Sequence, residues 1–253
     1  MRILAYNIWD GGGDRLDVIA DVIRGVDPDA VALVEATVES ASTLAADLGF
    51  ELSFGEVDGL FDLHLAWLSR LPIRRARNHQ LRELSKTLLE IQVAGIRLFA
   101  THLASRHEEH AHPRVEEVRA ILRILERVHG PHLLVGDFNA LQPGEAVGKP
   151  PPGVVPRGDA LPDADRVVLS PLAHAGYVDC FRALTGEPGY TYTAQTPWLR
   201  LDYAFASHDV APRVSSCAVT TGDLAARASD HLPVVVEVEP LEPGAVDSPH
   251  SRS

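Results

Sequence analysis

Apolar residues occur along the chain in two patterns, short runs that predict β-strands and periodic stripes that predict helices. The strand-like runs are residues 2–8, 31–34, 63–68, 87–93, 96–102, 133–135, 201–206 and 233–238. The helical stripes consist of Leu16, Ile19, Ala20 and Ile23 and of Val115, Val118, Ile121, Leu122 and Leu125. Strands and helices alternate early in the chain, whereas two later runs are joined at Ala94-Gly95 as in a hairpin. The pattern predicts an α/β (α+β) fold with mixed sheets.

Two segments interrupt this pattern. Residues 141–165 contain too many prolines and glycines for a helix or a central strand, and they begin soon after Asn139. We interpret them as a long loop, which inside a compact domain is usually either functional or disordered. Residues 240–253 are polar and rich in helix- and strand-breaking residues, which predicts a disordered tail. Residues 1–239 are expected to form one domain.

The segment HLLVGDFNALQPG, residues 132–144, ends a buried strand with a carboxylate and a carboxamide. Because side chains alternate along a strand, Asp137 and Asn139 are expected on one side and Phe138 on the other. Ligands of α/β sheets gather beyond the carboxyl ends of the strands, so this oxygen pair could hold a hard cation or a phosphoryl group. The alternative is a turn, in which Asp and Asn serve local hydrogen bonding.

Other strand ends repeat this polar ending. The residues are Asn7, Glu35, His102, Asp202, Asp230 and His231. Taken singly, each has an ordinary explanation as a cap, a strand end or a turn residue. Together with Asp137 and Asn139 they supply four carboxylates, two imidazoles and two carboxamides, and this collection predicts a shared polar site.

Seven short motifs carry a family resemblance. They are YNI at Asn7, LVEA at Glu35, LSRLPI from Leu68 to Ile73, THL at His102, GDFN at Asp137 and Asn139, RLDY at Asp202, and SDH at Asp230 and His231. In this order, over about residues 1 to 238, they resemble the endonuclease/exonuclease/phosphatase superfamily. That superfamily includes deoxyribonuclease I, exonuclease III-type AP endonucleases, neutral sphingomyelinases and inositol polyphosphate 5-phosphatases. The resemblance implies a four-layer sandwich of two packed mixed β-sheets flanked by helices, with the site where both sheets end.

The resemblance also implies an enzyme that hydrolyses phosphoesters with a divalent metal, Mg²⁺ or else Mn²⁺. The implied metal ligands, directly or through water, are Asn7, Glu35 and Asp230, and the implied catalytic residues are His102, Asp137, Asn139, Asp202 and His231. In this scheme Asp137 and Asn139 orient the attacking water and a phosphoryl oxygen. His231 hydrogen-bonds Asp202, which fixes the imidazole tautomer, and His102 donates to the phosphate. Which His or Asp acts as the general base stays open.

Several other residues have two explanations. Arg70 in LSRLPI contacts the substrate or lies at a structural turn, and Lys86 and Arg106 are either basic residues near the site or solvated surface charges. The segment RHEEHAH, residues 106–112, invites a zinc interpretation, but its spacing is not H-E-x-x-H and no cysteine accompanies it. We favour a solvated loop that leads into the second helix.

The chain departs from the family pattern near His102. Relatives of the deoxyribonuclease I type carry a Glu that orients this histidine, whereas the segment FDLHLAW offers only Asp62 and His64 as polar candidates. The partner of His102 is therefore open. AP endonucleases typically have tyrosine at the position of His102, so the resemblance is to the sphingomyelinase and 5-phosphatase branches more than to abasic-site repair enzymes.

Net charge narrows the choice of substrate. The 253-residue chain has 23 Lys and Arg against 35 Asp and Glu, a formal charge of -12, which argues against a surface for non-specific binding to nucleic-acid backbones. The favoured substrate is a small or lipid-like phosphodiester or phosphomonoester, so that the partner is a small phosphorylated molecule or a lipid headgroup. The alternative is a nuclease acting on DNA or RNA. A non-catalytic binding module is favoured less, because it has no need for clustered carboxylates.

The sequence also carries signs of its cellular compartment. Residues 1–13 lack the cationic region and cleavage site of a signal peptide, and no stretch approaches the roughly 20 apolar residues of a membrane span. Cys180 and Cys217 are far apart and in no ligand spacing, as expected for reduced thiols. These features predict a cytoplasmic monomer.

Overall fold

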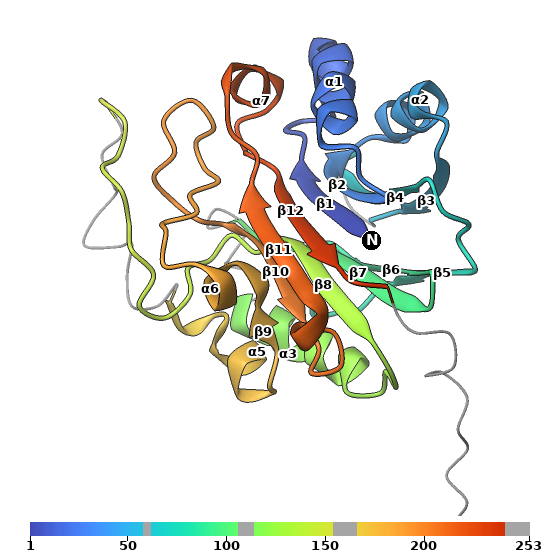
Figure 1. Ribbon diagram of the computed structural model, residues 1–253, viewed down its shortest axis with the longest axis vertical. Coiled ribbons are helices and arrows are strands. Elements are labelled where there is room, and N and C mark those ends of the chain that lie inside the picture. Colours follow the sequence, from blue (N-terminus) through green and yellow to red (C-terminus); the bar gives the residue numbers. More distant parts are fainter. Residues whose placement is uncertain (58–61, 106–113, 154–165, 241–253) are drawn as a thin grey trace, which may run out of the picture.

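The computed structural model describes residues 1–57, 62–105, 114–153 and 166–240, which form two six-stranded sheets packed face to face (Figure 1). The first sheet has the order β11 (Val214–Val219), β12 (Val234–Val238), β1 (Arg2–Asn7), β2 (Ala30–Ala36), β4 (His64–Ser69) and β3 (Glu51–Gly55). The second has the order β5 (Arg75–His79), β6 (Leu88–Val93), β7 (Ile96–His102), β8 (His132–Asp137), β10 (Asp202–Ala206) and β9 (Val178–Asp179). The strands β1 and β2 are parallel, as are β7 and β8, and the other described pairs are antiparallel.

Helices cover the outer face of each sheet. The first sheet is covered by α1 (Leu16–Val26), α2 (Val38–Leu48) and α7 (Asp223–Ala228), and the second by α3 (Arg114–Leu125) and α5 (Ser170–His174) (Figure 1). A short helix, α6 (Cys180–Leu184), packs beside β10 and β11. Two 3-10 helices span Gly13–Arg15 and Ala211–Arg213. The predicted four-layer sandwich of mixed sheets is confirmed.

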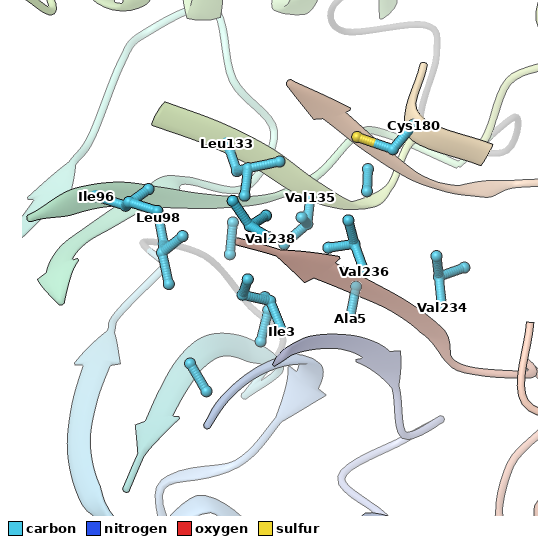
Figure 2. Packing of buried hydrophobic residues seen from close by; sticks show 14 of the residues in the cluster. Ile3, Ala5, Ile96, Leu98, Leu133, Val135, Cys180, Val234, Val236 and Val238 are labelled. Carbon is cyan, nitrogen blue, oxygen red and sulfur yellow. The ribbon is translucent and has the colours of Figure 1, made fainter. Parts of the chain in front are cut away.

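The largest apolar cluster fills the space between the two sheets. Side chains of β1 and β12, such as Ile3 and Val236, point toward Leu98, Leu133 and Val135 of the second sheet (Figure 2). Neighbouring residues of the same strands face the helices, because side chains alternate along a strand. The central strands are therefore apolar on both faces and appear in the sequence as unbroken runs rather than alternating ones.

The predicted strands and the unpredicted ones occupy different positions in the sheets. The eight runs recognised in the sequence are the eight interior strands β1, β2, β4, β6, β7, β8, β10 and β12. The four strands that were not predicted, β3, β5, β9 and β11, all lie at sheet edges. Edge strands are partly solvated and accept charged residues, as in RARNH of β5, so their sequences lack an apolar run.

Two local predictions have clear outcomes. The hairpin of β6 and β7 is confirmed, and Ala94 and Gly95 both have positive φ, 49° and 82°, as a tight two-residue hairpin turn requires. Both predicted helices are confirmed as α1 and α3, whereas α2 was missed because its sequence is rich in Ala, Ser and Thr. In the described part of the chain, no helix has the length and apolar character needed to cross a membrane. The predicted tail from residue 241 and the loop residues 154–165 lie outside the described residues.

Candidate active site

The sheet register brings the predicted polar residues to one end of the sandwich. Asn7 is paired with Val34 at the end of two parallel strands of the first sheet, and Glu35 follows directly. In the second sheet His102 pairs with Asp137, which in turn pairs with Asp202. Strands β1 and β8 face one another across the central layer, so the two groups meet.

Glu35 and Asn7 form the part of the site that the first sheet supplies. The Asn7 carboxamide donates to Glu35 Oε1 at 3.0 Å and to Asp137 Oδ2 at 3.1 Å, which links the two sheets. The second Glu35 oxygen accepts from the Asp10 backbone N–H at 2.9 Å. Glu35 has a positive φ of 61°, a conformation that is costly for a residue with a side chain and is found at functional sites.

Asp137 lies at the centre of the site and is almost fully buried. Its Oδ2 atom is 3.6 Å from His102 Nε2 and 3.8 Å from His231 Nε2, in addition to the bond from Asn7. The preceding Gly136 has φ 137°, and a Cβ atom there would lie 2.0 Å from the Thr101 carbonyl oxygen. Only glycine allows the two parallel strands to approach this closely just before the carboxylate.

Asn139 reaches the site differently from the expectation. Strand β8 ends at Asp137, and Asn139 has a left-handed φ of 47°, so strand alternation does not place it. Its backbone N–H donates to Asp137 Oδ1 at 2.8 Å, and its carboxamide nitrogen is 3.1 Å from His102 Nε2. Phe138 does turn into the apolar layer under α3, as expected.

His231 and Asp202 form a buried pair. His231 Nδ1 is 2.8 Å from Asp202 Oδ2, which is the predicted hydrogen bond. Asp202 is held through its backbone N–H, which donates to the Thr191 hydroxyl at 3.2 Å. The Ser229 hydroxyl donates to the Asn7 carbonyl at 2.7 Å and accepts from the His231 backbone N–H at 3.1 Å. Sequence reasoning missed Thr191 and Ser229, since a buried hydroxyl that braces two loops has no motif of its own.

The open question about His102 has a local answer. Its observed hydrogen-bond partner among the described residues is Asn139. His64 is instead 2.8 Å from Asp62, and its other ring nitrogen accepts from the Val57 backbone N–H. The two candidates from FDLHLAW therefore pair with each other and not with His102.

Arg70 does not lie at the site. It follows Ser69, which pairs with Ala30 at the start of β2, whereas Glu35 lies near the other end of that strand. At about 3.3 Å per residue, five residues of strand separate the two positions by roughly 16 Å. The Arg70 guanidinium bonds Asp27. The expectation of a substrate contact is corrected. Strand β4 runs antiparallel to β2, so the end of β4 that carries Arg70 lies at the opposite end of the strands from Glu35. Arg106 and the segment 106–112 lie outside the described residues.

Two carboxyl groups of the site, those of Asp137 and Asp230, have raised pKa values. Burial raises the pKa of Asp137 to about 6; the charge of His231 opposes this shift and that of Asp202 adds to it. Burial also raises the pKa of Asp230, with His231 opposing and Glu35 adding. Burial is the main cause of both shifts, and the neighbouring carboxylates add to it, so each group would be easier to ionise beside a bound cation.

The pKa values of Glu35 and His231 shift in the direction that keeps each side chain charged. Burial alone would raise the pKa of Glu35, but the charge of His102 and the hydrogen bonds from Asp10 and Asn7 bring it below its ordinary value. For His231, burial lowers the pKa, yet the carboxylates of Asp202 and Asp137 outweigh it and raise the pKa to about 10.

The donor set suits a hard divalent cation. Four carboxylates face two imidazoles, so negative charge is in excess even when both histidines are protonated. Carboxylate and carboxamide oxygens are the ligands that Mg²⁺ prefers. Ligand atoms of Asp137, Asp202 and His231 also lie within 4.8 Å of one another. His231 Nδ1 and Asp202 Oδ2 are already joined by a hydrogen bond, so we favour the oxygens around Glu35 as the place for the ion.

A second buried polar group, which we call the arginine cluster, consists of Glu145, Asp179, Arg182 and Arg200. Arg200 donates to Asp179 at 2.7 Å and 3.0 Å and to Glu145 at 2.5 Å, and Arg182 also bonds Glu145. The cluster joins the loop after β8, the start of α6 and the segment two residues before Asp202. It therefore fixes the entry of Asp202 into the site.

The arginine cluster also holds the start of the long loop at residues 141–165, called the Pro-rich loop below. The Glu145 carbonyl accepts from Arg166 at 2.6 Å, which joins residues on either side of the undescribed segment 154–165. The Gly148 backbone N–H donates to the Trp198 carbonyl at 2.8 Å. The described part of this loop is thus packed against the 190–201 segment that leads to Asp202.

A model of the Endonuclease/Exonuclease/phosphatase family matches residues 4–231. The chain belongs to this family. Family membership indicates a hydrolytic phosphoesterase, whether nuclease or phosphatase, and agrees with the order of motifs along the chain. No match was found among curated proteins.

Solved structures of the family share the fold. An AP endonuclease from Archaeoglobus fulgidus is 19% identical with a TM-score of 0.72, covering 94% of this chain and 99% of that chain. A 3'-5' exonuclease from Neisseria meningitidis is 19% identical with a TM-score of 0.73, covering 94% and 100%. An endonuclease/exonuclease/phosphatase from Beutenbergia cavernae is 24% identical with a TM-score of 0.69, covering 93% and 70%. At these identities the likeness extends to the fold alone.

Proposed function

We propose that the protein is a divalent-metal-dependent hydrolase that cleaves a small or lipid-like phosphodiester or phosphomonoester by attack of an activated water. The observation that carries this proposal is the convergence of Asn7, His102 and His231 on Asp137 Oδ2, within 3.1 to 3.8 Å. Carboxamide, imidazole and carboxylate groups around one point can orient a water and a phosphoryl group together.

We assign the metal site to Glu35, with Asn7 and Asp230 beside it as direct or water-mediated ligands. Mg²⁺ or Mn²⁺ bound there would neutralise charge on the phosphoryl oxygens. Asn7 donates to Glu35 and to Asp137, so it sets the distance between the metal site and the reacting centre.

The hydrogen bonds of the chain support the remaining assignments that we propose. Asp202 holds His231 by Nδ1, so that the imidazolium presents its Nε2–H to a phosphoryl oxygen. Asp137 accepts the proton of the attacking water as the oxygen bonds to phosphorus and the bond to the leaving group breaks. The Asn139 carboxamide N–H donates to His102 Nε2 and fixes the ring. We assign His102 as the donor to a second phosphoryl oxygen, a role that requires a protonated Nε2 and the exchange of this contact for the substrate.

The excess of acidic residues supports a small substrate over a polynucleotide, since the formal charge is -12. The alternative is a nuclease acting on DNA or RNA. It gains support from the fold shared with an AP endonuclease and a 3'-5' exonuclease.

Hydrolysis of bis-p-nitrophenyl phosphate and p-nitrophenyl phosphate tests the proposal, each with Mg²⁺, Mn²⁺ or EDTA. We expect metal-dependent hydrolysis that is lost in Asp202→Asn. A panel of nucleotides, phospholipid headgroup esters, and single-stranded and duplex oligonucleotides then separates the small-molecule enzyme from the nuclease. Absence of hydrolysis with every metal and every substrate would favour a non-catalytic binding protein.

A further inference from the structure

The loop that follows β1, residues Trp9 to Gly13, exposes a large aromatic side chain beside the candidate site. Trp9 is 46% exposed, whereas the other tryptophans, Trp67 and Trp198, are 0% and 5% exposed. An exposed indole has no role in the core, and here it stands two residues after the proposed metal ligand Asn7.

The backbone of this loop is attached to the site itself. The Trp9 backbone N–H donates to Asn7 Oδ1 at 3.0 Å, and the Asp10 N–H donates to Glu35 Oε2 at 2.9 Å. The Gly11 N–H donates to the Glu35 carbonyl at 2.8 Å. Two of the three residues that we assign to the metal site, Asn7 and Glu35, therefore hold the backbone of Trp9 and of the two residues after it next to that site.

The conformation of the loop is specific. Five consecutive residues from Trp9 to Gly13 have positive φ, between 50° and 80°. A Cβ atom at Gly11 would lie 2.8 Å from the Thr37 side chain, so glycine is needed for the approach. Trp9 itself has φ 55°, which is an outlier for a bulky residue and is kept only when the surroundings enforce it.

Arg15 enforces the position of the indole. Its guanidinium donates to the carbonyls of Trp9 at 2.5 Å, Ile8 at 3.2 Å and Ala228 at 2.6 Å, which ties this loop to the segment just before Asp230. The same guanidinium lies over the indole, 4.6 Å from the ring centroid. One face of the ring is thereby covered and its plane is fixed.

We propose that Trp9 is a stacking platform for a neutral planar ring, such as a nucleobase, that the phosphoester substrate carries. This deepens the proposed function and rests on it. A flat π-surface of fixed orientation next to a phosphate site matches a base joined to a phosphate through a sugar. Because Arg15 places a positive charge against the indole, a second cation such as a choline headgroup is disfavoured on the other face.

Binding of two matched ligands tests the platform. Adenosine 5'-monophosphate and ribose 5-phosphate carry the same phosphate and sugar and differ in the base. Their affinities would be measured by calorimetry with Mg²⁺ in the Asp202→Asn variant, which suppresses turnover. We expect the nucleotide to bind about tenfold more tightly, a ratio that Trp9→Phe largely keeps and Trp9→Ala abolishes. Leu184→Ala, which removes a similarly exposed apolar side chain on α6, should leave the ratio unchanged.

Two further arms complete the experiment. The affinity of a short single-stranded oligonucleotide would be compared with that of the mononucleotide. The tighter of the two shows whether the base that stacks on Trp9 belongs to a small nucleotide or to the end of a strand, and either result supports the platform. Equal affinities for the two matched ligands, an unchanged ratio in Trp9→Ala, or a Trp9-dependent preference for phosphocholine would each overturn it. A wild-type protein that hydrolyses no phosphoester but keeps the Trp9-dependent ratio would refute the proposed function alone.

Discussion

The arginine cluster and the candidate site are two buried polar groups of the described residues, and they differ in the balance of charge. In the arginine cluster two guanidinium groups face two carboxylates, and the pairs are at hydrogen-bond distance. In the candidate site four carboxylates face two imidazoles, and Asp137 and Asp230 have raised pKa values. A balanced group can stabilise the fold without any ligand, whereas an unbalanced one costs stability until a cation or a proton enters. The comparison separates residues that position the site from residues that act in it.

The largest effect is expected on kcat, from substitutions in the candidate site. Asp202→Asn and His231→Ala should each lower kcat about 10²- to 10⁴-fold, and the double variant should be little worse because the pair acts as a unit. Asp202→Asn also removes the carboxylate that bonds the buried His231 and raises the pKa of its imidazole, so part of the stability without metal should be lost as well. Asp209→Asn, at an exposed position just after β10, is the matched control. Near-normal kcat in His231→Ala would contradict the assigned pair.

Arg200→Met should lower stability strongly and kcat only slightly. It leaves Asp179 and Glu145 without their buried partner, which is expected to cost about 3 to 5 kcal/mol in the free energy of unfolding. At low temperature the folded fraction should keep kcat within severalfold of the wild type. Arg24→Met removes an exposed arginine that pairs with Asp21 and Asp47, and should leave the free energy of unfolding nearly unchanged. If Arg200→Met and Arg24→Met had the same midpoint of urea unfolding, the arginine cluster would not stabilise the fold as this comparison requires.

The Pro-rich loop tests whether the balanced cluster also positions a specificity element. Replacing residues 154–165 by a short Gly-Ser segment leaves Glu145 and its partners in place. We expect kcat/KM for the best substrate of the panel to fall roughly tenfold or more, while bis-p-nitrophenyl phosphate is little affected, since loops at strand ends commonly carry specificity. Equal losses on both substrates, or none, would show that the segment does not select the substrate.

The smallest effect concerns a buried polar group without any charge. Burial lowers the pKa of His132 below its ordinary value, and its ring nitrogens bond the Gly130 carbonyl and the Tyr177 hydroxyl. In the unfolded chain the His132 imidazole is protonated near pH 6.5, whereas in the folded chain it is protonated only at lower pH. The free energy of unfolding therefore falls as the pH drops below that value. By pH 5.5 this contributes up to about 1 kcal/mol. His132→Gln should flatten the stability–pH curve, and His208→Gln, at an exposed histidine, should not.

The sequence predicted the interior of the fold and failed at its edges for a physical reason. Interior strands are covered on both faces and are read from apolar runs, but edge strands such as β5 are half solvated. Asp137 was found because it ends a buried run. The arginine cluster was not found, since Glu145 and Arg200 are 55 residues apart and nothing local marks their contact.

The site shows the same division. The motifs located Glu35, Asp202 and His231 because strand register carries such residues to a common edge. Arg70 was misplaced because its motif gives no strand direction, and β4 turns out to run away from the site. Trp9 was overlooked, since one aromatic residue in a glycine-rich loop carries no spacing from which exposure could be inferred.

Binding of Mg²⁺ to the protein after exhaustive dialysis against EDTA tests the central claim most directly. The unbalanced charge of the candidate site predicts one saturable Mg²⁺ site by calorimetry, together with a rise in the free energy of unfolding of about 2.7 kcal/mol when Mg²⁺ is present at about a hundred times its Kd. Glu35→Gln should weaken this binding by about tenfold or more, whereas Arg24→Met should not change it. If the wild type bound neither Mg²⁺ nor Mn²⁺, or if Glu35→Gln bound the ion as tightly as the wild type, the candidate site would not be the metal site that the account requires.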